Sequence, residues 1–548
     1  MVFTAELRRK LDQIRDYLYG GGYPDPLSNA EQLSFLFFFY MIESLDASNL
    51  RQSRSMGRPY TSIFDGKWEL KETRGKDKPK DEKKTIPKEH LRWSKWANGM
   101  SGNSLVEFVR DEVFPFFSDV GDQYGMNFMA NARLAIDDPV VLSQVISLIN
   151  DLHLEDQDPD TKGDLFEHVL RQIKQAGELG QFRTPRHIIR RIVQLVAPKI
   201  GETVYDPAAG TAGFLVAAYE HIRLANSSEA GIEESEVENK TYRRGSGDKL
   251  SSKQWRTLQT ETFYGNDVDG KMVSLATMNL TLRGLPDVRI MKRNVLTTSM
   301  ERADKAKNQL PLDGYNVILA NPPFSGRLDK DRIVEDVKIG TTTATEILFL
   351  KYMMDNLAEN GRCGVIVPEG ILFGSTGAHK ELRRMLIENN RVEAVLSLPG
   401  GVFQPYSGVK TSVLIFTKGK DKKKRATQRV MFLHADQDGF KLDANHDTPI
   451  DADDLPGLIS AFNSREDIWE DWRARDPAKP WTEKWWFADT DYIRAEGFNL
   501  SASRYRPDAS EAVEHADPRD LLRELRDETV SILEEIDALA ANLAEVQR

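Results

Sequence analysis

The sequence predicts an α/β protein built on a doubly wound parallel sheet, with a helical domain before it and a helical tail after it. Between about residues 166 and 430, short Val/Ile/Leu-rich runs such as Tyr315–Ala320 alternate with amphipathic helical patterns. Such alternation is typical of buried parallel strands joined by helices. Before this region, apolar residues recur at three- and four-residue spacing from Leu7 to Leu18, and the same spacing returns from Leu522 to Val546, which indicates helices at both ends.

These changes of pattern divide the 548 residues into three parts. We expect a helical N-terminal domain at 1–165, a catalytic domain at 166–480 and a C-terminal helical segment at 481–548 that docks a partner. Residues 52–88 are expected to form an exposed loop, and the insertion at 227–260 has no assigned function. The apolar run Leu33–Ile42 has ten residues, whereas a membrane span needs about 20, so we expect a buried helix and no membrane partner.

The amino-acid composition limits how the protein can bind nucleic acid. The formal net charge is −11, whereas a protein that grips DNA alone normally carries a basic surface. A DNA substrate would therefore require a local basic channel or a more basic partner, and the lysine-rich stretches 67–88 and 418–429 are candidates for the channel. The single cysteine and the lack of a signal-peptide pattern favour the cytoplasm.

The sharpest chemical signal is the motif Asn321-Pro322-Pro323-Phe324, directly after the predicted strand YNVILA. Ligands of doubly wound sheets sit at such strand ends. The Asn321 side-chain oxygen and the Pro322 carbonyl can accept both hydrogens of a planar conjugated amino group, which would localise its lone pair for attack on a methyl donor. Phe324 offers a face for stacking an extruded base.

A second signal is VYDPAAGTAGF, in which a strand ends at Asp206 and a turn with Gly210 and Gly213 opens a helix. The glycines permit close approach of a ligand, and the helix N-terminus attracts negative groups. Two later strands are predicted to end at Asp267, which is placed to accept ribose hydroxyls, and at Asn294, near where an adenine would lie. Together these residues indicate a nucleoside cofactor.

A third signal is GELGQFRTPRHII, in which Thr184 and Pro185 suit the N-cap and first position of a helix. Arg183 and Arg186 would then lie close to the acids of the cofactor pocket. No metal is predicted: the histidines show no HExxH pattern, and the calcium-like spacing Asp156, Asp158, Asp160 and Glu167 has Thr161 where that loop needs glycine.

Taken together, GQFRTPR, DPAAGTAGF, GND, NPPF and PGGVFQPYSGVKTSVLIF resemble the modification subunit of type I restriction-modification systems. That resemblance implies a Rossmann-like, S-adenosylmethionine-dependent methyltransferase domain acting on adenine N6 in double-stranded DNA. It implies cofactor contacts by Gln181, Phe182, Arg183, Thr184, Pro185, Arg186, Thr211, Ala212, Gly213 and Asp267, and adenine contacts by Asn321–Phe324. Phe324 stands where tyrosine is commoner, Asp267 where glutamate is usual and Asn294 where aspartate is common.

The resemblance also implies partners: two modification subunits with one DNA specificity subunit, and a restriction/translocase subunit. Two other functions stay open on the residues alone. The Asn-Pro-Pro-aromatic motif also suits the amide nitrogen of a protein glutamine, and a catalytically silent, cofactor-binding scaffold would need the same fold. The sequence does not give the recognised DNA site, nor whether the complex also restricts DNA.

Overall fold

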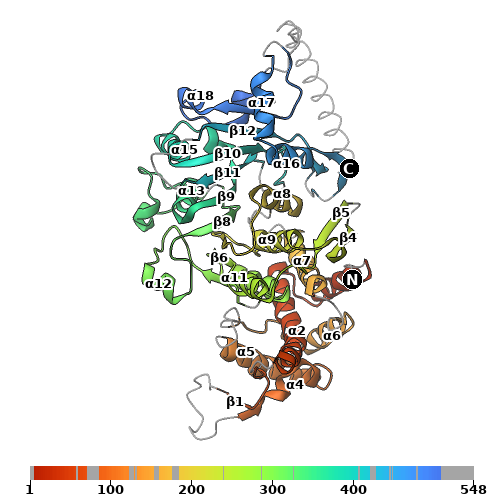
Figure 1. Cartoon of the computed structure of the whole chain (residues 1–548). Helices are drawn as coiled ribbons and strands as arrows, with labels where there is room; N and C mark the ends of the chain where they lie inside the picture. Colours follow the sequence, from red (N-terminus) through yellow and green to blue (C-terminus); the bar gives the residue numbers. More distant parts are fainter. Residues whose placement is uncertain are drawn as a thin grey trace, which may run out of the picture.

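The computed structural model describes residues 5–507, except 57–59, 71–84, 122–128, 130–131, 154–158, 176–183, 238–239, 286, 325, 405–407, 420–426, 444–445, 447 and 477–478. The predicted helical pattern from Leu522 to Val546 and most of the two lysine-rich stretches therefore lie outside the described residues. Figure 1 shows a helical domain at one end of the molecule and a large α/β domain above it. Within the described part of the chain, no helix combines the length and apolarity needed to cross a membrane.

The helical domain has its own hydrophobic core. The predicted buried helix at Leu33–Ile42 lies in the long helix α2, and its phenylalanines pack against those of α5. Described parts of the expected loop at 52–88 form regular structure: α2 continues to Met56, and β1 and β2 pair and bury Trp68 and Ile86. The elements are α1 (Ala5–Gly20), α2 (Pro26–Met56), β1 (Lys67–Glu69), β2 (Thr85–Pro87), α3 (Trp93–Trp96), α4 (Gly102–Phe108), a π-helical turn (Val109–Val113), α5 (Phe114–Gly121), α6 (Pro139–Asn150) and α7 (Pro159–Gln175).

The α/β domain starts with α8 and contains the helices α8 (Arg186–Val196), α9 (Gly213–Ala225), α10 (Ser252–Thr260), α11 (Gly270–Leu282), α12 (Arg302–Lys307), α13 (Thr345–Asn356), α14 (Glu369–Phe373), α15 (Gly377–Asn389), α16 (Leu455–Asn463), α17 (Asp467–Ala474) and α18 (Thr490–Ala495). Its strands are β3 (Val204–Asp206), β4 (Ile232–Val237), β5 (Lys240–Gly245), β6 (Phe263–Asp267), β7 (Arg289–Lys292), β8 (Tyr315–Ala320), β9 (Leu357–Pro368), β10 (Asn390–Ser397), β11 (Thr411–Lys418), β12 (Arg429–His434), β13 (Asp438–Phe440), β14 (Pro449–Asp453) and β15 (Trp485–Asp489).

Nine described strands form the central sheet in the order β15-β12-β10-β11-β9-β8-β3-β6-β7. The five strands from β7 to β9 are parallel, which confirms the predicted doubly wound α/β class. Because β3 lies between β6 and β8, the strand order reverses at β3, and such a switch point opens a crevice at the carboxyl ends of the strands. This crevice lies beside the predicted motifs.

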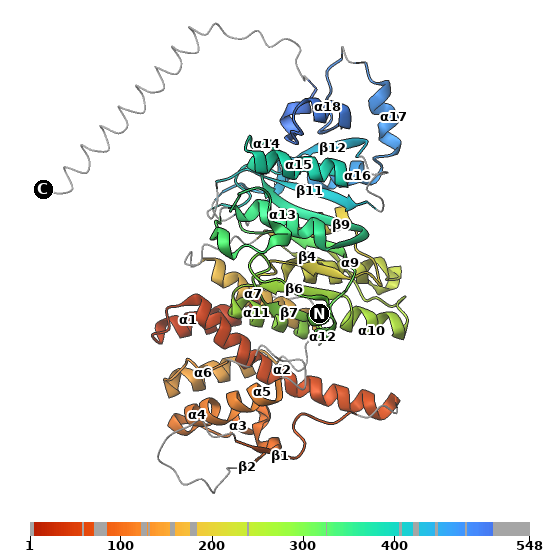
Figure 2. The same ribbon diagram turned by 90° about the vertical axis from the view of Figure 1, so that its left-hand side faces the viewer.

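Helices cover both faces of the sheet. Figure 1 shows α8 and α16 on one side of it and α13 and α15 on the other. In Figure 2 the helical domain lies below the sheet, with α11 near the junction. Helix α11 contacts β6 and β7 on one side and α2 and α7 on the other. Its leucines and methionines enter both hydrophobic cores, so the two domains share one apolar junction.

The structure departs from the sequence expectations at the carboxyl-terminal side of the sheet. β10 and β11 are antiparallel, and they lie inside the sheet because β12 and β15 extend it. β15 (Trp485–Asp489) lies beyond residue 480, and Phe487, Ile493 and Tyr505 join the core of the α/β domain. At the other boundary, α7 continues across residue 165. We therefore propose domain limits near residues 176 and 507.

Candidate active site

Three chemistry-bearing residues meet at one edge of the sheet. Asp267 ends β6, Asp206 ends β3, and Asn321 directly follows β8. These strands are parallel neighbours, so their carboxyl ends lie side by side. The sheet topology therefore brings together residues that are up to 115 positions apart in the sequence.

A cleft with about 690 Å³ of empty space opens at this edge, between the starts of α8 and α9. This volume includes solvent space at the open mouth of the cleft. It is lined by predicted site residues from all three motifs: Thr184, Arg186, Asp206, Gly210, Thr211, Gly213 and Asn321. Gln181, Phe182 and Arg183 lie outside the described residues.

Asn321 is held by a residue of the preceding motif. Its Nδ2 donates a hydrogen bond to Thr184 Oγ1 at 2.8 Å. Its Oδ1 is buried and makes no hydrogen bond. Because an unpaired buried acceptor is costly, this oxygen is a ready partner for an N–H donor that enters the cleft.

The predicted N-cap role of Thr184 is wrong. Helix α8 begins at Arg186 with Pro185 as its N-cap residue, and no side chain caps it. The Thr184 hydroxyl is instead the acceptor for Asn321. Thr184 therefore serves the site through a long-range contact that local capping rules do not reveal.

The turn between β3 and α9 is fixed by Asp267. Gly210 and Ala212 have φ of +51° and +66°, in the left-handed region that favours glycine. The Gly210 N–H donates to Asp267 Oδ2 at 3.0 Å, and the Asp269 N–H donates to Asp267 Oδ1 at 2.9 Å. Among the described residues, Asp267 does not line the cleft; in this structure its carboxylate holds the turn rather than facing the cleft.

Asn294 lies one strand further along the same edge. It comes two residues after the end of β7, and its Oδ1 accepts a hydrogen bond from the Leu296 N–H at 3.0 Å. It does not line the cleft either, within the described chain. Its predicted position near an adenine therefore stays a prediction.

Asp206 is a buried acid in the floor of the cleft. Only 1% of the residue is exposed, and its Oδ1 accepts a hydrogen bond from the Ala208 N–H at 3.0 Å. Burial, together with the nearby charge of Asp267, raises the pKa of the Asp206 carboxyl to about 8. The side chain therefore carries a proton at neutral pH.

The rest of the Asn-Pro-Pro-Phe motif is less open than the stacking role requires. Pro322 is buried and Pro323 is exposed. Phe324 is 5% exposed and meets Phe403 edge-on, with ring centroids 5.5 Å apart at 90°. A base that stacks on Phe324 would have to displace part of this packing.

One wall of the cleft is charged, and the sequence analysis missed most of it. Glu167 of α7 pairs with Arg186, and Glu220 of α9 lies 3.6 Å from Arg190. Burial and repulsion by Arg190 and Arg283 lower the pKa of Arg186 to about 9. Burial alone would raise the pKa of Glu220, but four nearby arginines (Arg190, Arg283, Arg186 and Arg244) lower it to about 2. The wall therefore presents both signs of charge to the cleft.

Arg283 supports this wall from behind. Its side chain is fully buried, and its guanidinium lies 3.1 Å from Glu167 Oε1 and 3.4 Å from Asp164 Oδ1. A Cβ on Gly163 would come within 2.5 Å of the guanidinium carbon. Only glycine at position 163 leaves room for Arg283 at this spot.

The insertion at 227–260 also reaches the charged wall. Its hairpin β4–β5 packs against α9, Arg244 pairs with Asp164 at 2.8 Å, and the Tyr242 ring lies under Arg190 at 4.4 Å. The insertion therefore supports α7 and α8 where they border the cleft. A local sequence pattern would not show these contacts, because each joins residues far apart in the chain.

The chain matches the family model of the N-6 DNA Methylase over residues 157–514. The chain belongs to the N-6 DNA methylase family. This methylase also matches the HsdM N-terminal domain over residues 7–149. It is 30% identical over 471 residues to the type I restriction enzyme EcoEI methylase subunit of Escherichia coli, covering 82% of this chain and 84% of that relative.

Solved structures agree on the fold of the methylase. The type I restriction-modification system methyltransferase subunit from Streptococcus thermophilus has a TM-score of 0.62 at 18% identity, covering 91% of this chain and 99% of that one. A chain from a structure of type I R-M complex assembly has a TM-score of 0.63 at 24% identity, covering 98% and 99%. These findings confirm the predicted resemblance: the chain is a type I methyltransferase subunit and an adenine-specific DNA methyltransferase.

Proposed function

We propose that this methylase transfers a methyl group from S-adenosylmethionine to N6 of adenine in double-stranded DNA, as the modification subunit of a type I complex. The proposal rests on the position and the hydrogen bonding of the Asn321 side chain. Its side chain is fixed at the end of β8 by Thr184, it lines the cleft, and its buried Oδ1 has no hydrogen-bond partner. That oxygen is free to accept from an amino group.

The chemistry of the reaction needs such acceptors because the adenine amino nitrogen is a poor nucleophile. Its lone pair is delocalised into the ring. Asn321 Oδ1 and the Pro322 carbonyl would accept its two hydrogens and favour tetrahedral geometry at nitrogen, so that the lone pair is localised for attack. Pre-placed acceptors of this kind stabilise the transition state without reorganising during the reaction.

The side chains that line the cleft have the chemistry needed to bind the methyl donor. S-adenosylmethionine would supply an electrophilic methyl group on a sulfonium, and its amino-acid end carries an ammonium and a carboxylate. Glu220 has a buried carboxylate oxygen without a hydrogen bond, and Arg190 lies beside it. Glu167 also lines the cleft and is paired with Arg186 and Arg283. We propose that the acids bind the ammonium, that the arginines bind the carboxylate, and that Asp206 and the Gly210–Gly213 turn bind the rest of the cofactor.

We infer the partner subunits from the net charge of this chain and from the relatives named above. A subunit with a net charge of −11 is poorly suited to grip DNA alone. We propose that two copies assemble with one DNA specificity subunit, which reads the sequence, and that a restriction/translocase subunit can join them. Chromosomal DNA as substrate would place this complex in the cytoplasm. We also propose that the chain after residue 507, which lies outside the described residues, contributes to docking.

The test is transfer of tritiated methyl groups by the full chain assembled with the specificity subunit encoded beside it. Unmethylated genomic DNA and the complex's own proteins are counted separately for label. The proposal expects label in DNA, at N6 of adenine, and its loss in Asn321→Ala. Label in protein would favour glutamine methylation, and no label in either would favour a silent scaffold.

A matched control keeps this test interpretable. Asn308→Ala changes an exposed asparagine directly after α12, whose Nδ2 donates to the Asp304 carbonyl of the last turn. This variant should methylate DNA at the wild-type rate. Equal loss of label in both variants would show that the substitution at Asn321 acts through folding rather than chemistry.

A further inference from the structure

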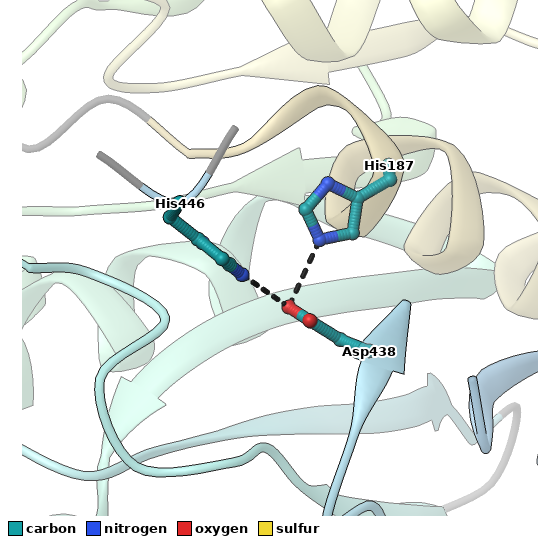
Figure 3. A group of neighbouring side chains, drawn as sticks. All are labelled: His187, Asp438 and His446. Carbon is teal, nitrogen blue, oxygen red and sulfur yellow. Dashed lines mark hydrogen bonds and ion pairs between the residues drawn. The ribbon is translucent and has the colours of Figure 1, made fainter. Parts of the chain in front are cut away.

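A second cluster of chemistry-bearing side chains lies next to the cleft, on the other side of α8. His187, Asp438 and His446 converge on one point, with their ligand atoms all within 4.8 Å of one another. Figure 3 shows the His187 and His446 rings pointing at the same oxygen of Asp438. His187 Nε2 and His446 Nε2 each lie 2.9 Å from Asp438 Oδ2.

The cluster joins separate parts of the chain. His187 is the second residue of α8, and Asp438 begins β13. His446 lies between β13 and β14. The side chains of Asp438 and His446 are 0% and 1% exposed, and that of His187 is 13% exposed. The site is therefore shielded from water but reachable past His187.

His446 reaches the cluster through its Nε2 atom. Its Nδ1 lies 3.2 Å from the Val402 carbonyl, and because a carbonyl only accepts, Nδ1 carries a hydrogen. Its Nε2 lies 2.9 Å from Asp438 Oδ2, although no well-formed hydrogen bond joins the two atoms. An imidazole nitrogen and a carboxylate oxygen at this distance are held together by a cation between them, either a proton or a metal ion.

The backbone conformation of His446 also indicates that its ring is held in place. His446 has a φ of +47°, in the left-handed region that non-glycine residues seldom occupy. Backbone strain of this kind persists where the surrounding structure holds a residue in place, and it is common at functional sites. Here it accompanies the placement of the His446 ring against Asp438.

We propose that His187, Asp438 and His446 bind a zinc-class divalent cation through two imidazole nitrogens and one carboxylate oxygen. Zinc–nitrogen and zinc–oxygen bonds of about 2.0–2.1 Å in a tetrahedron place ligand atoms about 3.3 Å apart. The two observed separations of 2.9 Å need to open by only a few tenths of an ångström. A metal-bound imidazole usually donates its other ring N–H to a carbonyl or a carboxylate. His446 Nδ1 faces the Val402 carbonyl in this way.

The cation would position the active site rather than take part in methyl transfer. His187 adjoins Arg186 of the charged wall. Val402, which accepts from His446, adjoins Phe403, which packs against Phe324. Metal bound here would tie the start of α8 and the Val402–Phe403 turn to β13. The sequence analysis predicted no metal because the three ligands are spread over 260 residues and form no local motif.

The experiment measures zinc in the full chain, purified without a histidine tag and without chelators. The protein is incubated with one equivalent of Zn²⁺, separated from free ions and analysed by mass spectrometry for metal per chain. Cobalt replacement is followed by visible absorption, which reports tetrahedral coordination. The variants are His446→Gln and His187→Gln. The control is His434→Gln, because His434 has one aspartate partner at 3.0 Å in a pair that lacks a second histidine.

The proposal expects about one zinc per chain in the wild type and in His434→Gln, with affinity reduced in both cluster variants by more than the 10- to 100-fold that loss of an outer partner costs. A wild-type chain that retains no zinc and shows no tetrahedral cobalt spectrum would overturn it, leaving a hydrogen-bonded Asp438. Zinc retained equally by the cluster variants would also overturn it. The wild-type result decides the question even if a variant does not fold.

Discussion

Asn321 Nδ2 donates to Thr184 Oγ1 at 2.8 Å, and this contact orients the amide so that its oxygen is left free in the cleft. An amide that turned about its last bond would present nitrogen, a donor, to the incoming amino group. With the Thr184 hydroxyl as its acceptor, Nδ2 is held away from the incoming amino group and Oδ1 stays available. Thr184 belongs to the segment before α8, so this segment and the catalytic motif act together.

Thr184→Val should slow methyl transfer without weakening cofactor binding. Loss of one orienting hydrogen bond is worth about 1 kcal/mol, so kcat should fall about fivefold to tenfold. Thr184→Ser, which keeps the hydroxyl, should restore most of the rate. Steady-state kinetics with DNA, beside calorimetry of the cofactor, measure both effects; an unchanged kcat in Thr184→Val would contradict the orienting role.

Asp267→Ala should weaken cofactor binding because it releases the turn that contains Gly210. The carboxylate accepts from the Gly210 and Asp269 N–H groups, and hydrogen bonds to a charged group are worth about 1.5–3 kcal/mol. Isothermal titration calorimetry of S-adenosylmethionine measures the loss. The control is Asp304→Ala, at an exposed position on α12. Equal affinity for S-adenosylmethionine in both variants would show that Asp267 does not support cofactor binding.

Asp206 should make the stability of the protein depend on pH. Its carboxyl has a pKa of about 8 in the folded protein and about 3.9 when unfolded. Between these values the folded chain holds a proton that the unfolded chain has released, so stability falls as pH rises. At about 1.4 kcal/mol per pKa unit, the fall amounts to several kcal/mol.

Asp206→Asn should remove this dependence, since asparagine keeps an acceptor for the Ala208 N–H and carries no charge. Its free energy of unfolding, from urea titration, should match that of the wild type near pH 4 and exceed it increasingly up to pH 8. A difference that stays constant over this range would show that Asp206 ionises normally in the folded protein.

Gly163→Ala should destabilise the protein through Arg283. The new methyl group would lie 2.5 Å from the guanidinium, and overpacking of this kind costs about 1–3 kcal/mol. Gly457→Ala in α16, where a Cβ meets nothing within 4 Å, should instead stabilise by about 0.5–1 kcal/mol. Chemical denaturation compares the two; a neutral Gly163→Ala would mean that Arg283 can move without cost.

Removal of residues 518–548 should prevent assembly with the specificity subunit while cofactor affinity stays nearly unchanged. The spacing of Leu522, Leu525, Ile532 and Ile536 predicts a helix with one apolar seam, which suits docking to another helix. Size-exclusion chromatography with light scattering measures assembly. If assembly and cofactor binding were lost together, the tail would belong to the catalytic fold instead.

The sequence allowed prediction of the features that depend on neighbouring residues. The buried strand before Asn321, the turn after Asp206 and the helix at Leu33–Ile42 follow from apolar runs, glycines and spacing, and the structure contains each of them. The family was predicted from the same motifs, because their order along the chain is specific.

Features that depend on tertiary contacts were missed. Thr184 has the sequence of an N-cap, but its hydroxyl meets Asn321, 137 residues away. Glu167 was considered only as a position in a calcium-like spacing, and Glu220 was not considered. Their role depends on pairing with Arg186 and Arg190 in the same wall of the cleft. Strand β15 was missed since its pairing with β12 joins distant segments.

The most direct test of the central claim is a structure of the assembled complex with a non-reactive cofactor analogue and a duplex that contains the recognised site, which sequencing of modified bases in the host genome would identify. The account predicts an extruded adenine in the cleft, with its N6 within about 2.7–3.2 Å of Asn321 Oδ1 and of the Pro322 carbonyl. An adenine bound elsewhere, or Asn321 Oδ1 turned away from a cleft too narrow for a base, would contradict it.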